Sequence, residues 1–155
     1  MKTLDQIPPT WSQKLQCDAT ACPRFELVLD GAAVLDKETG LVWEKWPNTS
    51  GGTWFEVRSH CNTTWVGNRA GWRLPTVQEL ASLADLTQSN PALPAGSPFR
   101  YVLSDYYWTA TLEGHNDSTA AWLVYFGNGG VTYGNKEYPG HKGWCVRGGQ
   151  GVDVQ

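Results

Sequence analysis

Hydrophobic positions alternate with polar ones in short runs near both ends of the chain. Such alternation is typical of β-strands that lie with one face on a core. The early strands are predicted at residues 25–29, 32–35 and 41–45, and Gly40 suits the positive φ that the loop of the hairpin requires. Asn128-Gly129 is a strong hairpin turn among the later strands. These later strands are predicted at residues 107–111, 120–126, 131–135 and 143–147.

Two helices are predicted between these groups of strands, and each begins at a capping box. Thr53 with Glu56 forms the first box, and Thr76 with Glu79 forms the second. Each helix has one apolar face, made of Trp54, Val57, Cys61 and Trp65 in the first and of Val77, Leu80, Ala81 and Ala84 in the second. The order of strands, helices and strands predicts an α+β fold with two helices packed on antiparallel sheets.

The length of 155 residues fits one domain, which we place at residues 25–155 behind an N-terminal arm of residues 1–24. The net charge of -3, without a basic stripe, argues against nucleic acid as a partner. Apolar runs are too short for direct membrane insertion. The N-terminus has no apolar segment typical of a signal peptide, so the protein is either cytoplasmic or an exported protein without its leader.

Four cysteines bear on that choice, and they allow three disulfide connectivities. Cys17 and Cys22 are close enough in sequence to close a small ring, which would leave Cys61 to pair with Cys145. The alternatives are four reduced thiols, or a zinc site, for which the three histidines look too scattered. An even number of cysteines in a turn-rich domain favours disulfides, and therefore an extracellular or cell-surface location over a cytoplasmic one.

Five short segments, taken in their order along the chain, form a pattern that is more specific than any one of them. They are Asp36–Lys45, Gly71–Thr76 with Glu79-Leu80, Tyr107–Thr111, Ala121-Trp122 with Phe126 and Gly129, and Trp144–Gly149. This set, spanning about residues 25–150, resembles the Lcl C-terminal domain, also called domain-of-unknown-function family 1566. The arm with Cys17 and Cys22 lies outside the resemblance.

The resemblance implies a C-type-lectin-like fold, related to that of formylglycine-generating enzymes. It also implies a bacterial protein that is exported or surface-attached, and several members of the family act in adhesion or glycan binding. Cys61 and Cys145 look like the bridging pair of the family. Proteins of this fold also serve as targets of diversity-generating retroelements, which rewrite residues near the C-terminus. A reverse transcriptase beside the gene would support that hypothesis, and its absence, with no near-copy of the 3′ end, would remove it.

The last hairpin carries the candidate ligand-binding residues. If Trp122, Val124 and Phe126 point into the core, then alternation directs the side chains between them outward, and Val131 points inward on the return strand. Three groups of residues make up the candidate site: the outward positions of the hairpin, the loop that follows it, and a tyrosine that we place beside a polar loop at 113–118. Together they are Tyr106, Leu123, Tyr125, Gly127, Gly130, Thr132, Gly134, Tyr138, His141 and Lys142. Aromatic rings among small polar residues are typical of binding surfaces. The solvated face of an ordinary sheet, and a plain turn beside Tyr106, remain the alternatives.

The sequence gives no sign of catalysis, and neither a catalytic residue nor a cofactor is expected. Serine-hydrolase, zinc-protease and phosphate-loop motifs are absent. Formylglycine-generating enzymes need two neighbouring active-site cysteines, whereas Cys61 and Cys145 look structural. The triplets that bind Ca²⁺ and sugar in C-type lectins are also absent, so no metal ligands are predicted, although a structural Ca²⁺ stays open.

We therefore expect a non-catalytic recognition domain that binds a surface glycan or a protein, with the alternative of a structural subunit in a bacterial surface oligomer or filament. A homo-oligomer would be compatible with either. Of the nine tryptophans, five fall in the resembling segments and are predicted to be core: Trp43, Trp72, Trp108, Trp122 and Trp144. Arg73 and Arg147, beside core strands, are predicted to be buried hydrogen-bond donors.

Overall fold

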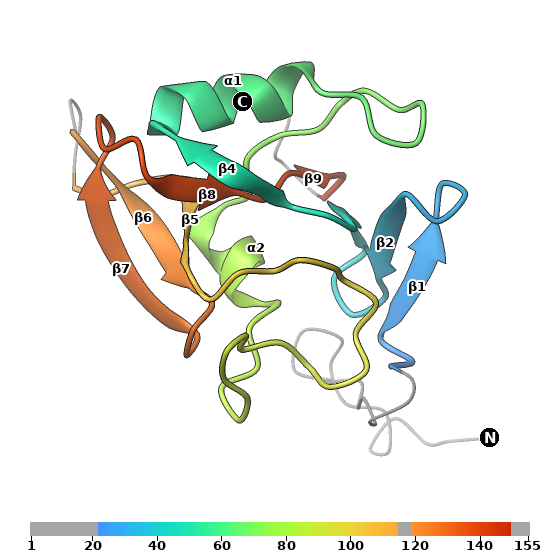
Figure 1. Ribbon diagram of the computed structural model, residues 1–155. Coiled ribbons are helices and arrows are strands. Elements are labelled where there is room, and N and C mark those ends of the chain that lie inside the picture. Colours follow the sequence, from blue (N-terminus) through green and yellow to red (C-terminus); the bar gives the residue numbers. More distant parts are fainter. Residues whose placement is uncertain (1–21, 115–118, 150–155) are drawn as a thin grey trace, which may run out of the picture.

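A computed structural model describes residues 22–114 and 119–149 and has the mixed α+β architecture that the sequence predicts (Figure 1). Two short helices accompany two sheets. The helices are α1 (Trp54–Thr63) and α2 (Val77–Ala81). The strands are β1 (Phe25–Val28), β2 (Ala33–Asp36), β3 (Leu41–Glu44), β4 (Asn48–Gly52), β5 (Tyr106–Leu112), β6 (Ala120–Tyr125), β7 (Gly130–Asn135), β8 (His141–Gly143) and β9 (Val146–Arg147).

One sheet has four strands in the order β1-β2-β3-β9, and the other has five in the order β4-β8-β5-β6-β7. All pairs are antiparallel except β5 with β8, which run parallel. The chain passes from the five-stranded sheet to the four-stranded one between β8 and β9. Trp144 and Cys145 lie at this crossing, and both are fully buried. The junction of the two sheets is therefore part of the core.

Both capping boxes form as predicted. The side chain of Thr53 accepts a hydrogen bond from the N–H of Glu56, and the Glu56 carboxylate accepts one from the N–H of Thr53. Thr76 and Glu79 make the same reciprocal pair at α2. The second helix is only five residues long, but its predicted apolar residues all contact the core. Trp65 is an exception on the first helix, since it lies beyond the end of α1 and is 68% exposed.

The two helices cover opposite faces of the five-stranded sheet. Leu80 of α2 belongs to a core cluster with Tyr107 and Val124, whereas Val57 of α1 belongs to a second cluster with Leu123. Alternation along β6 places Val124 and Leu123 on opposite faces of that strand. The central part of the sheet is thus buried on both sides, whereas the sequence predicted one buried face and one exposed face for the last hairpin.

This double coverage corrects the predicted orientation of the last hairpin. Leu123 and Gly127 were expected to face outward, but both are buried, Leu123 at 2% exposure. Trp122 was expected in the core but is half-buried, edge-on to Tyr133 of the neighbouring strand. Val131 was expected to point inward but is 47% exposed, because β7 is the outermost strand of its sheet.

Most other predictions about the core are confirmed. Trp43, Trp72, Trp108 and Trp144 are buried. Arg73 is buried and donates hydrogen bonds to the Glu79 carboxylate at 2.8 Å. Arg147, predicted to be buried, is instead only partly so, and its Nε donates to a backbone carbonyl at 2.7 Å.

Some predicted features lie outside the described residues or were missed. Most of the predicted arm, together with Cys17 and its proposed pairing with Cys22, lies outside them. Strand β4 was not predicted, because its sequence Asn-Thr-Ser-Gly-Gly has no apolar position to produce alternation. Among the described residues, no helix has the length and apolar character needed to span a bilayer.

Candidate functional site

Four aromatic side chains gather at one end of the five-stranded sheet, and we call them the tyrosine–histidine cluster: Tyr106, Tyr125, Tyr138 and His141. The ring centroids of Tyr106 and Tyr125 are 4.6 Å apart, and the two ring planes are tilted by 31°. His141 lies 5.5 Å from Tyr106 and 4.5 Å from Tyr138. Tyr138 is 53% exposed and the other three are half-buried. All four were predicted binding residues, and the fold brings them together.

Three neighbouring strands and one turn position these rings. Tyr106 of β5 and Tyr125 of β6 are direct cross-strand partners, which accounts for the close contact of their rings. His141 begins β8, on the other side of β5, and its ring also meets the edge of Trp108 at 4.9 Å. Trp108 is fully buried, so the cluster is continuous with the core beneath it. A surface supported in this way presents rings whose rotamers are restricted before a ligand arrives.

Three glycines make room for the rings. A Cβ atom at Gly127 would overlap the Tyr125 ring, and one at Gly140 would lie 2.6 Å from the Tyr138 ring. A Cβ atom at Gly134 would lie 3.0 Å from Leu123 and 3.3 Å from the His141 ring. Gly127 and Gly134, which were predicted ligand contacts, therefore leave room for these rings, and their contact with a ligand stays a prediction. Gly140 was missed, although the Pro139-Gly140 dipeptide marks it as a turn.

The charged neighbours of the cluster are Lys142 and Asp105. The Lys142 Nζ lies 3.7 Å from the Asp105 carboxylate, and alternation along β8 directs Lys142 to the face opposite His141. Burial lowers the pKa of His141, Asp105 opposes this effect, and Lys142 adds to it. Because the net shift is downward from 6.5, the imidazole is neutral at pH 7. Asp105 was not predicted, and nothing in its sequence context distinguishes it.

The remaining predicted residues do not join the cluster. Gly130 and Thr132 are exposed on the edge strand β7, and they lie beside Tyr125 and Leu123 of β6 in the register. Leu123 packs under α1 and is not accessible to a ligand. Helix α1 contacts β8, β4 and β5, so it covers part of the same face. The candidate site is thus smaller than predicted and is centred on the rings.

The predicted bridge between Cys61 and Cys145 is confirmed. It joins α1 to the segment between β8 and β9, with the two Cα atoms 5.3 Å apart. Glu44 lies beside it, and its carboxylate accepts a 2.6 Å hydrogen bond from the N–H of Cys145. Burial raises the pKa of Glu44 to about 7, and the hydrogen bond from Cys145 only partly offsets that rise. The sequence did not single out Glu44, which looked like the polar end of a strand.

Comparison with known proteins identifies one relationship. No curated protein matches the chain at a significant level. The family model of the Lcl C-terminal domain matches residues 32–147, which includes every strand from β2 to β9, both helices, the disulfide and the tyrosine–histidine cluster. This match covers most of the chain and agrees with the five segments that carried the resemblance. The chain belongs to the Lcl C-terminal domain family.

Proposed function

We propose that the chain is a non-catalytic recognition domain that binds a surface glycan through the tyrosine–histidine cluster. The observation that supports this most is a set of four rings that lie at the surface although they continue a buried aromatic core. An aromatic ring offers a flat apolar face to the C–H groups of a sugar, while tyrosine hydroxyls and a neutral histidine can hydrogen-bond to its hydroxyls.

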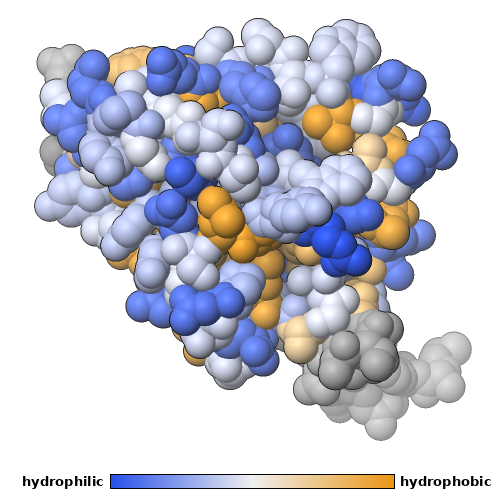
Figure 2. All heavy atoms as spheres, viewed as in Figure 1, coloured by the Kyte–Doolittle hydropathy of each residue, from blue (hydrophilic) through white to orange (hydrophobic). Residues whose placement is uncertain are grey.

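The polarity of the molecular surface bears on the kind of partner that the domain can bind. Hydrophilic residues predominate on the face seen in Figure 2, and the hydrophobic atoms in view lie mainly near its middle and at its right edge. A broad apolar patch would instead indicate a permanent protein interface. A protein is the alternative ligand that we propose for the same rings.

Two further expectations belong to this proposal. The fold is proposed to be C-type-lectin-like and related to that of formylglycine-generating enzymes, on the basis of family resemblance and of two short helices with two sheets. The domain is proposed to act outside the cytoplasm, because the Cys61–Cys145 disulfide is compatible with an oxidising compartment.

An array of glycans and proteins tests the proposal. We expect the wild-type chain to bind a restricted set of glycans, and the triple variant Tyr125→Ala, Tyr138→Ala, His141→Ala to lose that binding. Tyr133→Ala is the matched control, since Tyr133 is also an exposed tyrosine at 55% but lies on the opposite face of β7 from Gly134. Equal binding by the wild type and the triple variant would place the site elsewhere.

A second candidate function is that of a subunit in a surface assembly, and the edge strand β7 favours it. All six residues of β7 are uncharged, and five of them are exposed. Edge strands without charged residues or proline are suited to pairing with another strand. Among the described residues, β6 is the only strand that pairs with β7. Light scattering after size-exclusion chromatography separates the candidates, because a stable monomer that binds a glycan supports recognition and self-assembly supports the second function.

A further inference from the structure

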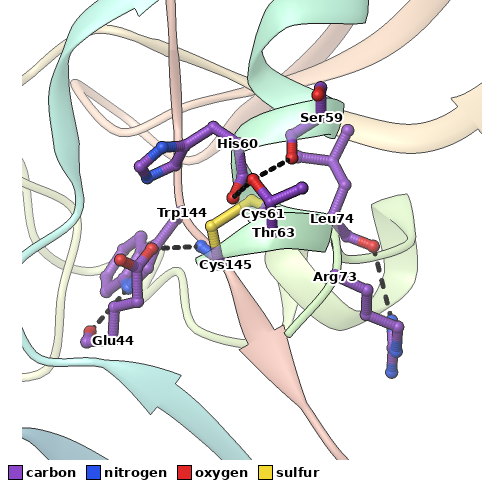
Figure 3. The surroundings of a disulfide bond; sticks show 9 residues. All are labelled: Glu44, Ser59, His60, Cys61, Thr63, Arg73, Leu74, Trp144 and Cys145. Atoms are coloured by element: carbon purple, nitrogen blue, oxygen red, sulfur yellow. Dashed lines mark hydrogen bonds between the residues drawn. A yellow bond between two sulfur atoms is a disulfide. The ribbon is translucent and has the colours of Figure 1, made fainter. Parts of the chain in front are cut away.

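The Cys61–Cys145 disulfide has two other ligand-type side chains beside it. A carboxylate oxygen of Glu44, a ring nitrogen of His60 and the sulfur of Cys145 all lie within 4.8 Å of one another. Figure 3 shows Glu44 and His60 on the same side of the disulfide. His60 is exposed, whereas both cysteines are fully buried. Four potential metal ligands therefore meet at one point that is open to solvent through a single side chain.

Distant segments produce this arrangement. His60 and Cys61 are adjacent on α1, Glu44 ends β3, and Cys145 lies between β8 and β9. Two hydrogen bonds hold Glu44 against Cys145, one from the Glu44 N–H to the Cys145 carbonyl at 3.2 Å and one from the Cys145 N–H to the Glu44 carboxylate at 2.6 Å. The sequence argued against zinc because the histidines look scattered, but the fold removes that objection for His60.

We propose that reduction of the disulfide converts this point into a tetrahedral site for a zinc-class divalent ion, with Cys61, Cys145, His60 and Glu44 as its ligands. Two thiolates, an imidazole and a carboxylate are all groups that zinc takes in proteins. Tetrahedral bonds of about 2.0 to 2.3 Å require ligand atoms roughly 3.3 to 3.8 Å apart. The observed spacing is close enough that side-chain rotations can supply the remaining adjustment.

The oxidised protein cannot form this site, because disulfide sulfurs are not thiolates. A reductant must supply two electrons and two protons, which break the S–S bond and leave two thiols. A dithiol does so and becomes its own disulfide, whereas a phosphine does so together with water and becomes its oxide. Binding of the ion then displaces the two thiol protons into solvent. Metal binding by this domain is therefore expected only in its reduced form.

The test is a titration of the full chain with Co²⁺, after treatment with a phosphine in metal-free buffer. We expect the reduced protein to develop the thiolate charge-transfer and visible bands of tetrahedral Co²⁺, and Zn²⁺ to abolish them. The untreated protein should show neither. His60→Ala and Glu44→Gln should each weaken binding at least tenfold. His141→Ala is the matched control and should bind like the wild type.

Two variants separate this site from the other cysteine pair. Cys17→Ala with Cys22→Ala should keep the bands, whereas Cys61→Ala should lose them. If reduction unfolds the metal-free chain, Zn²⁺ should restore its near-ultraviolet circular dichroism in the wild type but not in His60→Ala. Absence of the bands from the reduced wild type, failure of Zn²⁺ to refold it, or unchanged affinity in His60→Ala would each overturn the proposal.

Discussion

Trp144 and His141 lie three residues apart, yet each is the centre of a different aromatic cluster. Trp144 is fully buried, and its ring lies 4.9 to 5.9 Å from four others: Trp43, Phe99, Tyr107 and Phe126. His141 is half-buried, and its ring lies beside those of two tyrosines, Tyr106 and Tyr138, of which Tyr138 is 53% exposed. Aromatic side chains thus lie at the surface where β8 begins and in the core directly after β8 ends.

The difference shows how the surroundings of a ring decide what it can do. In the buried cluster the indole N–H of Trp144 donates to the Glu44 carbonyl at 2.8 Å, so its polar atom is satisfied within the protein. Rings there exclude water and contribute packing and apolar burial. In the tyrosine–histidine cluster the tyrosines keep a polar end near solvent. We therefore expect changes near Trp144 to lower stability and changes near His141 to lower binding.

The largest effect is expected from the covalent link beside Trp144. Cys61→Ala with Cys145→Ala removes a bridge across 84 residues, and the chain-entropy estimate gives a loss of about 4.5 kcal/mol in the free energy of unfolding. Urea denaturation measures it. The small ring that Cys17 and Cys22 would close provides the comparison, since the same estimate gives about 2 kcal/mol for its removal. A loss below about 1 kcal/mol for the large bridge would contradict this view of the junction.

The direct comparison of the two clusters is Trp144→Ala against Tyr138→Ala. Removing a fully buried tryptophan should cost about 4 kcal/mol, because it leaves a cavity among four rings. Removing Tyr138 should change stability by less than about 0.5 kcal/mol, because its side chain is largely in solvent. Denaturant midpoints of the two variants measure the difference. Similar losses for both would show that the surface rings are part of the core.

Between pH 4.5 and 8, a pH effect on stability is expected from Glu44, whose backbone carbonyl accepts the hydrogen bond of the Trp144 indole. Its pKa is raised from 4.5 to about 7 in the folded chain, so the folded state holds a proton that the unfolded state has already released. Its contribution to stability is therefore present below about pH 4.5 and falls as the pH rises toward 7, by on the order of 3 kcal/mol.

The measurement is urea denaturation of the oxidised protein between pH 4.5 and 8 with a chelator present. Glu44→Gln is the control, because an amide has the same shape and does not titrate. The variant should lose this part of the pH dependence, so that its stability relative to the wild type increases as the pH rises. If the free energy of unfolding of the two proteins changed with pH in the same way, Glu44 would not be the source of this pH dependence.

A small change in stability is expected from Gly127→Ala. A Cβ atom there overlaps the Tyr125 ring, whose end is half-exposed and can rotate away, so the cost should stay below about 1 kcal/mol. The contact between the rings of Tyr125 and Tyr106 should nevertheless be lost. Nuclear Overhauser effects between the two rings report it, and their persistence in the variant would show that Gly127 is not a spacer.

Much of the fold could be predicted from local signals. The two capping boxes, the early hairpin and the turn at Asn128-Gly129 each depend on residues close in sequence, and all are present. Strand β4 could not be predicted, because it has no apolar alternation and is defined by its pairing with β8. The family resemblance supplied the bridge between Cys61 and Cys145, which spacing alone left among alternatives.

The sequence predicted which rings belong to the candidate site but not why they lie together. The rings of Tyr106, Tyr125 and His141 come together because β8, β5 and β6 are neighbours, and that order is not visible in the sequence. Leu123 was wrongly predicted to face solvent. Alternation separates the two faces of β6, but it does not show that α1 and α2 cover both of them. The ligand, the site of action and variation by a retroelement stay predictions.

The most direct test of recognition is calorimetric titration of two matched variants with the glycan that an array selects. Tyr138→Ala removes a ring from the tyrosine–histidine cluster, and Tyr133→Ala removes an equally exposed ring on the other face of the hairpin. We predict that Tyr138→Ala raises the dissociation constant at least tenfold, or about 1.4 kcal/mol, and that Tyr133→Ala leaves it unchanged. Equal affinity of both variants and the wild type would contradict the assignment of binding to this cluster.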